Sequence, residues 1–144
     1  MNREIKFRGK TLYDHYDHYA SPEPDTKEGT WVYGDLMTEY PYHKGLTIVE
    51  NGVYHEVDPE TVGQYTGIKI GGQKLFEHDV VRYRETGSDD WQYGVVVWCG
   101  DSPYPAFDVE PWIDCDCNGL SYIVAVCEAE IIGNKWDNPE LLEV

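Results

Sequence analysis

Apolar residues recur at every second position in short runs along the chain, and glycine, proline or asparagine separates the runs. A spacing of two is typical of β-strands, whose side chains point alternately to opposite faces. The runs are also rich in β-branched and aromatic residues, which favour strands. They cover residues 4–8, 30–38, 46–49, 53–57, 80–83, 93–98 and 122–127. The pattern predicts an all-β fold, mainly β with one or two short helical turns.

In the first run, Ile5 and Phe7 are expected to face the core, and Gly9 is expected to end the strand. Tight hairpin turns are predicted at Asn51-Gly52 and at Asn118-Gly119, because both residue types tolerate positive φ. The same property predicts turns at three further glycines, Gly71, Gly72 and Gly87.

Two short helical turns are predicted where an N-cap acceptor precedes a proline, at Asp58-Pro59 and at Asn138-Pro139. The chain has 144 residues, a common size for one domain, so residues 1–144 are expected to form a single domain. Residues 13–29 are polar and proline-rich without a period, which predicts an exposed loop.

Charge changes this picture mainly in the second half of the chain. The net charge is -16, and residues 1–84 hold 10 basic and 14 acidic side chains. Residues 85–144 hold 13 acidic side chains and one basic one, Lys135. A polyanion such as nucleic acid is therefore disfavoured as a partner for a surface built from residues 85–144.

The expected location is the cytoplasm, since no run approaches a membrane span of roughly 18 apolar residues and the first residues lack a signal peptide's pattern. Cysteines there stay reduced, so free thiols are favoured over disulfides. Four thiolates could bind zinc, but a single residue between two of them is an uncommon spacing. The four are Cys99, Cys115, Cys117 and Cys127.

Two other patterns raise the question of metal binding. The turn from Asp114 to Asn118 resembles the start of a calcium loop, but Ala125 stands where such a loop needs glutamate, so a plain turn is favoured. His15 and His18, beside Asp14 and Asp17, would converge on a helix but need not do so on a loop. No residue is assigned to a metal, and metal binding by the cysteines or by the Asp114–Asn118 turn is left open.

Catalytic chemistry is not predicted. His78 and Asp79 are adjacent, and neighbours on a strand point to opposite faces. The chain contains no nucleophile elbow, phosphate-binding loop or dinucleotide fingerprint. The sequence therefore predicts a protein that is not an enzyme and needs no cofactor.

Four blocks of sequence, in order and at matching spacing, resemble the YopX family of phage and prophage proteins. They are Ile5–Lys10, Trp31–Leu36, Val57–Gly67 with Phe76–Val81, and Ile131–Asn134 with Asn138–Leu142. The chain departs from the family pattern in having a short turn at Gly71-Gly72 and His78 in place of a glycine. The resemblance implies a compact β body, SH3-like or barrel-like, that is encoded by a phage or prophage and associates with itself; the function it implies is unassigned.

The leading hypothesis is a non-enzymatic accessory protein that acts through protein contacts, with copies of itself and with a host or phage protein. Twelve tyrosines and five tryptophans exceed what one small core can hide, and exposed aromatic residues are typical of interfaces. The candidate interaction surface consists of Tyr13, Tyr16, Tyr19 and Trp112.

Two alternatives stay open. The β body could bind nucleic acid, although the net charge opposes it. Its candidate phosphate contacts are Arg3, Lys6, Arg8, Lys10, Lys69, Lys74, Arg82 and Arg84. The acidic second half could instead mimic nucleic acid and so inhibit a host DNA-binding protein.

Overall fold

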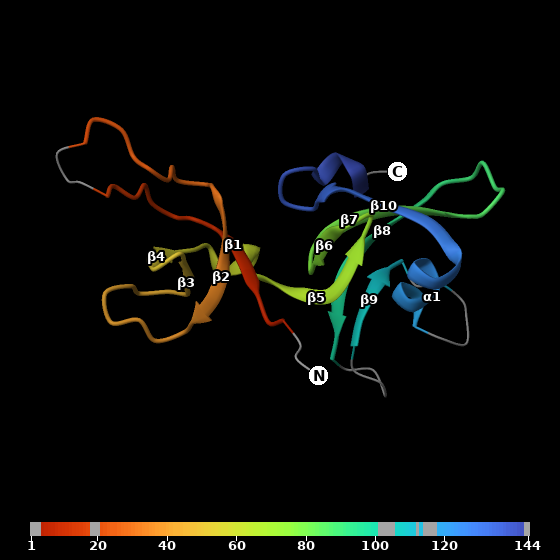
Figure 1. The fold of residues 1–144 in the computed structure, drawn as a ribbon, viewed down its shortest axis with the longest axis horizontal. Helices are drawn as coiled ribbons and strands as arrows, with labels where there is room; N and C mark the ends of the chain where they lie inside the picture. Colours follow the sequence, from red (N-terminus) through yellow and green to blue (C-terminus); the bar gives the residue numbers. More distant parts are fainter. Residues whose placement is uncertain (1–3, 18–20, 101–105, 112, 114–117, 143–144) are drawn as a thin grey trace. The chain divides into compact units, whose positions relative to one another are not determined.

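The computed structural model describes residues 4–17, 21–100, 106–111, 113 and 118–142. Contacts divide the chain into two compact units, Met1–Tyr65 and Thr66–Val144 (Figure 1). Strands dominate both units, which confirms the predicted all-β class. The single domain over residues 1–144 stays a prediction.

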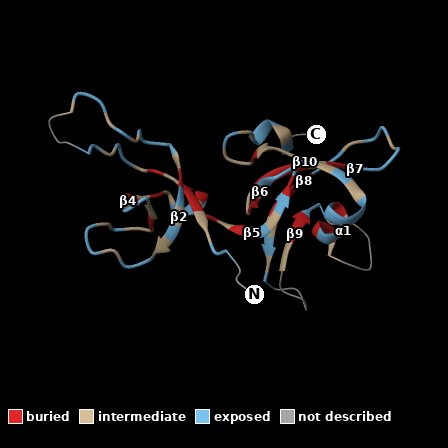
Figure 2. Ribbon diagram, in the orientation of Figure 1, coloured by how far each residue is buried: buried red, intermediate tan, exposed pale blue. Residues whose placement is uncertain are grey.

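The first unit is an antiparallel sheet in the order β4-β3-β2-β1-β5. Its elements are β1 (Phe7–Lys10), β2 (Trp31–Met37), β3 (Thr47–Glu50), β4 (Val53–Glu56), the 3-10 turn η1 (Pro59–Thr61) and the start of β5 (Gly63–Ile70). Figure 2 shows buried residues on these strands, and three side chains, Val32, Ile48 and Val57, form the centre of the core.

The first strand differs from its prediction. β1 begins at Phe7 and continues through Gly9, whereas Ile5 is 61% exposed and contributes nothing to the core. A Cβ at Gly9 would lie 3.1 Å from Cβ of Val57 and 3.2 Å from Cδ1 of Ile48. Glycine is therefore used here for close packing within the strand and does not end it.

Residues 12–30 leave the sheet as an extended arm, of which residues 12–17 and 21–30 are described (Figure 1). Most of these residues are exposed. The outgoing and returning segments of the arm meet where His15 and Thr26 form an isolated antiparallel bridge. The backbone N–H of Leu12 also donates to the carbonyl oxygen of Glu56 at 2.9 Å, which fastens the base of the arm to β4.

The second unit contains β6 (Gln73–Phe76), which pairs with the end of β5, and a four-stranded antiparallel sheet in the order β10-β7-β8-β9. The elements of this sheet and its connections are β7 (Asp79–Glu85), β8 (Gln92–Cys99), β9 (Ala106–Glu110), α1 (Gly119–Val126), β10 (Cys127–Asn134) and the 3-10 turn η2 (Pro139–Leu142). Among the described residues this sheet has two edges, β10 and β9, so it is an open sheet compatible with the expected barrel-like body.

The helix α1 corrects the sequence prediction. The hairpin turn predicted at Asn118-Gly119 and the strand predicted over residues 122–127 are wrong. Asn118 is instead the N-cap, and its side-chain oxygen accepts from the N–H of Ser121 at 3.1 Å. Asparagine is favoured both at helix N-caps and in tight turns, because its short side chain hydrogen-bonds to nearby backbone groups. The residue alone therefore does not distinguish a helix start from a hairpin turn.

The other predicted turns are confirmed. Asn51 and Gly52 join β3 to β4 with φ of 50° and 79°, and Gly71 and Gly72 join β5 to β6 with φ of 60° and 81°. Both predicted helical turns form, as η1 and η2. No helix in the described part of the chain is long and apolar enough to cross a membrane.

Candidate functional site

Four tyrosines gather on the first unit, and we call Tyr16, Tyr40, Tyr42 and Tyr54 the tyrosine surface. The rings of Tyr40 and Tyr54 stack with centroids 4.6 Å apart, and the ring of Tyr42 meets that of Tyr40 edge-on at 5.5 Å. Tyr42 is 83% exposed, and Tyr16 and Tyr54 are 42% and 41% exposed. Stacked yet exposed aromatic rings form a rigid amphipathic surface of the kind that protein interfaces use.

A cavity of about 360 Å³ lies within this surface. The arm lines one side of it with His15, Tyr16 and Asp17, and the turn between β3 and β4 lines the other with Gly52, Val53 and Tyr54. Tyr40 completes the lining. The cavity is open and bordered by aromatic rings, so a protruding side chain of a partner could enter it.

A group of titratable side chains lies beside the cavity. Donor atoms of His15, Asp17 and Asp25 all lie within 4.8 Å of one another. The ring of His15 also meets the ring of His55 edge-on, with centroids 5.4 Å apart. His55 is only 5% exposed, and this burial, together with the nearby His15, lowers the pKa of His55.

Only part of the predicted interaction surface is brought together. Tyr16 lines the cavity, while Tyr13 lies on the arm, 64% exposed, outside the cavity lining. Tyr19 and Trp112 lie outside the described residues. Sequence reasoning missed Tyr40, Tyr42 and Tyr54, although the tyrosines that flank Pro41 and the alternation in β4 were available signals.

In the first unit, the basic residues proposed as phosphate contacts are partly covered. Arg8 is 6% exposed and its guanidinium carbon lies 4.7 Å from the centre of the Trp31 ring. Nζ of Lys10 lies 5.4 Å from the centre of the same ring, and Nζ of Lys6 lies 3.9 Å from a carboxylate oxygen of Glu4. Arg3 lies outside the described residues.

In the second unit, Arg82 and Arg84 lie two positions apart on one face of β7. Their guanidinium carbons lie 4.1 Å and 4.4 Å from the centre of the Trp91 ring. Each is also paired with a carboxylate of β10, Arg82 with Glu130 and Arg84 with Glu128. The carboxylates neutralise the charge that a phosphate contact would need. Lys69 and Lys74 lie on β5 and β6.

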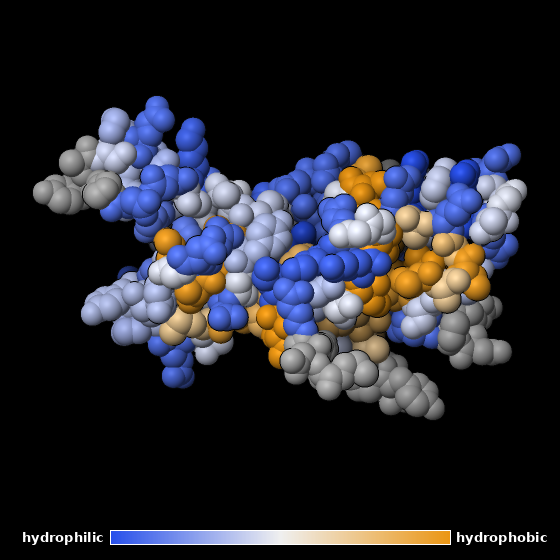
Figure 3. Space-filling model, in the orientation of Figure 1, coloured by the Kyte–Doolittle hydropathy of each residue, from blue (hydrophilic) through white to orange (hydrophobic). Residues whose placement is uncertain are grey.

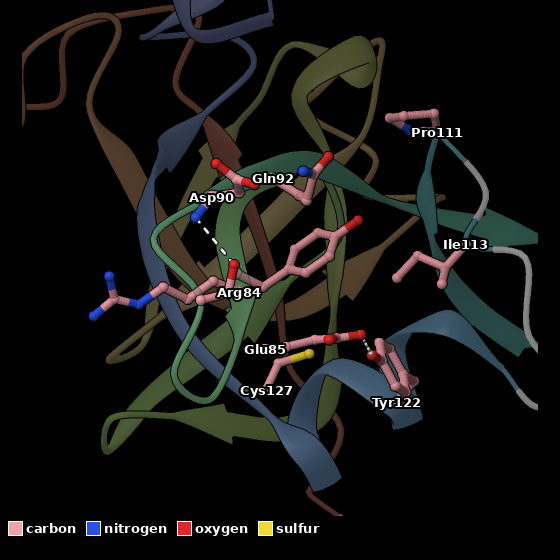
Figure 4. A pocket seen from close by; sticks show the side chains of 10 residues that line it. Arg84, Glu85, Asp90, Gln92, Pro111, Ile113, Tyr122 and Cys127 are labelled. Atoms are coloured by element: carbon pink, nitrogen blue, oxygen red, sulfur yellow. Dashed lines mark hydrogen bonds between the residues drawn. The ribbon is translucent and has the colours of Figure 1, made fainter.

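A larger cavity of about 570 Å³ lies in the second unit (Figure 4). Tyr122 points toward Glu85 there and donates a hydrogen bond to it at 2.7 Å, which raises the pKa of the Tyr122 hydroxyl. Cys127 lies beside this pair, and the guanidinium of Arg84 points away from it. The Tyr122 hydroxyl is therefore protonated at neutral pH and acts as a hydrogen-bond donor.

The two described cysteines are free thiols, Cys99 and Cys127. Burial raises the pKa of both, and for Cys99 the nearby carboxylates of Asp108 and Glu110 raise it further. Cys115, Cys117 and the rest of the Asp114–Asn118 turn before Asn118 lie outside the described residues. Metal binding by these cysteines or by that turn stays a prediction.

We expect Cys99 and Cys127 to react slowly with iodoacetamide at pH 7, because the thiolate is the reactive form and a raised pKa keeps it scarce. Raising the pH should speed both reactions, and the pH at which each rate reaches half of its maximum should lie above the ordinary pKa of a cysteine thiol. Mass spectrometry of the digested protein measures each site, and protein unfolded in urea is the control. Equal rates in folded and unfolded protein would contradict the expectation.

Hydrophobic residues gather over β9 and α1 of the second unit (Figure 3). Val124 and Val126 of α1 are 46% and 55% exposed, and Trp98 of β8 is 53% exposed with its ring edge-on to Phe107 at 5.0 Å. These side chains add apolar surface to the second unit.

Of the sequence blocks that resemble the YopX family, those before residue 66 build the framework of the first unit. Phe7 of the first block pairs with Gly34 of the second and with Gln64 of the third. The N–H of Lys10 donates to the hydroxyl oxygen of Thr61, 51 residues away, at 2.9 Å. These first blocks therefore pair with one another in the sheet from which the arm projects.

His78, where the family pattern has glycine, has φ of 79°. This left-handed backbone region favours glycine, which explains the family's preference at the position. The ring of His78 lies edge-on to the ring of Trp136 with centroids 5.6 Å apart.

Comparison with known proteins gives one assignment. The YopX protein family matches residues 25–143. No curated protein matches the chain. The match covers most of the 144 residues and includes both units, so the chain belongs to the YopX protein family.

Proposed function

We propose that this protein is a phage- or prophage-encoded accessory protein that acts in the bacterial cytoplasm without catalysing a reaction, by binding proteins through its tyrosine surface. The observation that carries the proposal is the stacking of the half-buried Tyr40 ring on the exposed Tyr54 ring beside an open cavity. Tyrosine offers a large contact area at a low cost in side-chain entropy, so an exposed tyrosine surface is well suited to binding a partner.

The chemistry around the cavity favours a partner segment with a basic side chain. The carboxylate of Asp17 lines the cavity, and the neighbouring Asp25 carboxylate hydrogen-bonds to the N–H of Asp17 at 2.8 Å. A lysine or arginine can stack on a tyrosine ring and pair with a carboxylate in the same place. Self-association is included in the proposal, because one copy could insert a basic side chain into the cavity of another.

The experiment compares Tyr54→Ala with Tyr93→Ala, since Tyr93 is a tyrosine of similar exposure, 39%, on β8. Sedimentation velocity over a range of concentrations measures self-association, and capture from a lysate of cells induced for the prophage measures other partners. Loss of a central aromatic contact costs about 1.4 kcal/mol or more, so Tyr54→Ala should weaken binding about tenfold while Tyr93→Ala leaves it unchanged.

A concentration-independent monomer, together with identical captured proteins for the wild type and Tyr54→Ala, would contradict the proposal. Circular dichroism of each variant shows whether the fold is retained. Because Tyr54 is 41% exposed, its removal should leave the fold intact.

A further inference from the structure

We propose that the tyrosine surface binds a proline-rich segment of another protein, held in the polyproline II conformation and flanked by a basic residue. This inference rests on the proposed function and names the chemistry of the partner. Surfaces that bind polyproline II segments are lined with aromatic rings, against which the proline rings pack. The contacting rings of Tyr40, Tyr42 and Tyr54, with the open cavity beside Tyr40 and Tyr54, supply such a lining.

The size of the tyrosine surface suits this conformation. The rings of Tyr42 and Tyr54 both contact the ring of Tyr40, with centroids 5.5 Å and 4.6 Å from its centroid. A polyproline II helix rises about 3.1 Å per residue with three residues per turn, so one turn is roughly 9 Å long. The three rings therefore fit beneath about one turn of the segment. Tyr16 of the arm continues the aromatic surface into the cavity.

Hydrogen-bonding chemistry also favours a proline-rich segment over an ordinary extended one. Proline has no backbone N–H, and a polyproline II helix makes no internal hydrogen bonds, so its carbonyl oxygens need donors from the surface that binds it. A tyrosine hydroxyl is such a donor. The exposed side chains of Tyr16, Tyr42 and Tyr54 therefore offer both requirements of the segment, a ring for packing and a hydroxyl for a carbonyl oxygen.

The charge of the arm indicates that the segment carries a basic residue. Residues 12–30 contain five acidic side chains and one basic side chain, Lys27. Asp17 lines the cavity together with Tyr16 and Tyr54, which places negative charge beside the aromatic rings. Opposite charges on two partners speed their association and fix the register in which they bind. The chain's own proline-rich segment, residues 22–25, is acidic, so a segment of another protein fits this surface better than the arm of a second copy.

The test measures the binding of a fluorescein-labelled synthetic peptide, a run of prolines followed by arginine, to the full-length protein by fluorescence anisotropy. Tyr54→Ala should weaken the affinity about tenfold, because it removes a ring on which proline packs. Tyr93→Ala is the matched control, since Tyr93 is 39% exposed on β8, outside the tyrosine surface. Its affinity should stay within about twofold of the wild type.

Two further peptides separate the effect of proline from that of charge. A peptide that keeps the arginine but has glycine and serine in place of proline should bind at least about tenfold more weakly, because it lacks the proline rings and must be ordered on binding. A proline peptide with glutamate in place of arginine should bind about fivefold more weakly. Added salt should reduce the second difference, since salt screens exposed charges.

The inference is overturned if the proline–arginine peptide does not bind, if the glycine–serine peptide binds equally well, or if Tyr54→Ala binds like the wild type. Should circular dichroism show that Tyr54→Ala is unfolded, Tyr42→Ala gives the same decision, because Tyr42 is 83% exposed. The proposed function is tested separately. Loss of captured proteins or of self-association in Tyr54→Ala, with no peptide binding by the wild type, would support protein binding and refute only the proline-rich partner.

Discussion

Replacing Gly34 with alanine is expected to unfold or severely destabilise the first unit. Gly34 lies in β2, and a Cβ there would stand 1.8 Å from the carbonyl oxygen of Val49 and 2.8 Å from its carbon. These are backbone atoms of the neighbouring strand β3, so no side-chain rotation relieves the clash. Overpacking usually costs about 1–3 kcal/mol, and this position should exceed that range.

Gly45→Ala is the matched control. A Cβ at Gly45 would lie 3.5 Å from a carboxylate oxygen of Glu56, which is an ordinary contact with the end of a flexible side chain. Its free energy of unfolding should change by less than about 0.5 kcal/mol. Urea denaturation followed by circular dichroism measures both variants, and similar stabilities for the two would show that β2 and β3 approach less closely than described.

Most strands and turns of the first unit could be predicted because the residues that specify its turns act locally. Asn51-Gly52 and Asp58-Pro59 each act through local chemistry, positive φ in one case and an N-cap acceptor in the other. Gly9 could not be interpreted in the same way, because its role depends on Val57 and Ile48, which are distant in sequence. A single sequence does not show which distant residue a glycine will contact.

The candidate site was harder to predict than the fold. Tyr16 was identified from the aromatic composition of the arm, but Tyr40 and Tyr54 join it only through the folding of the arm along β4. His15 and Asp17 were considered together from their spacing, whereas Asp25 joins them from the returning segment of the arm, across the His15–Thr26 bridge. Each missing member is brought in by pairing across the arm or the sheet, which local spacing does not encode.

The helix α1 shows how the interpretation of one residue, Asn118, changes the expected burial of the residues that follow it. Once Asn118 is taken as an N-cap, Leu120 and Ile123 are three residues apart and lie on one helical face, and both are fully buried. An alternating strand would have placed them on opposite faces. The apolar run over these residues fits either period, so burial decides between the two interpretations.

Replacing Ile123 with alanine is therefore expected to destabilise the second unit by about 3 kcal/mol. Ile123 is 0% exposed and belongs to the core cluster that contains Leu75, Val81 and Val96. Removing its outer carbons leaves a cavity that the surrounding strands fill only in part. Val124→Ala is the control, because Val124 is 46% exposed on the same helix and alanine is the better helix former. Its stability should change by less than about 0.5 kcal/mol, and equal losses in the two variants by urea denaturation would contradict the assignment of a buried helical face to α1.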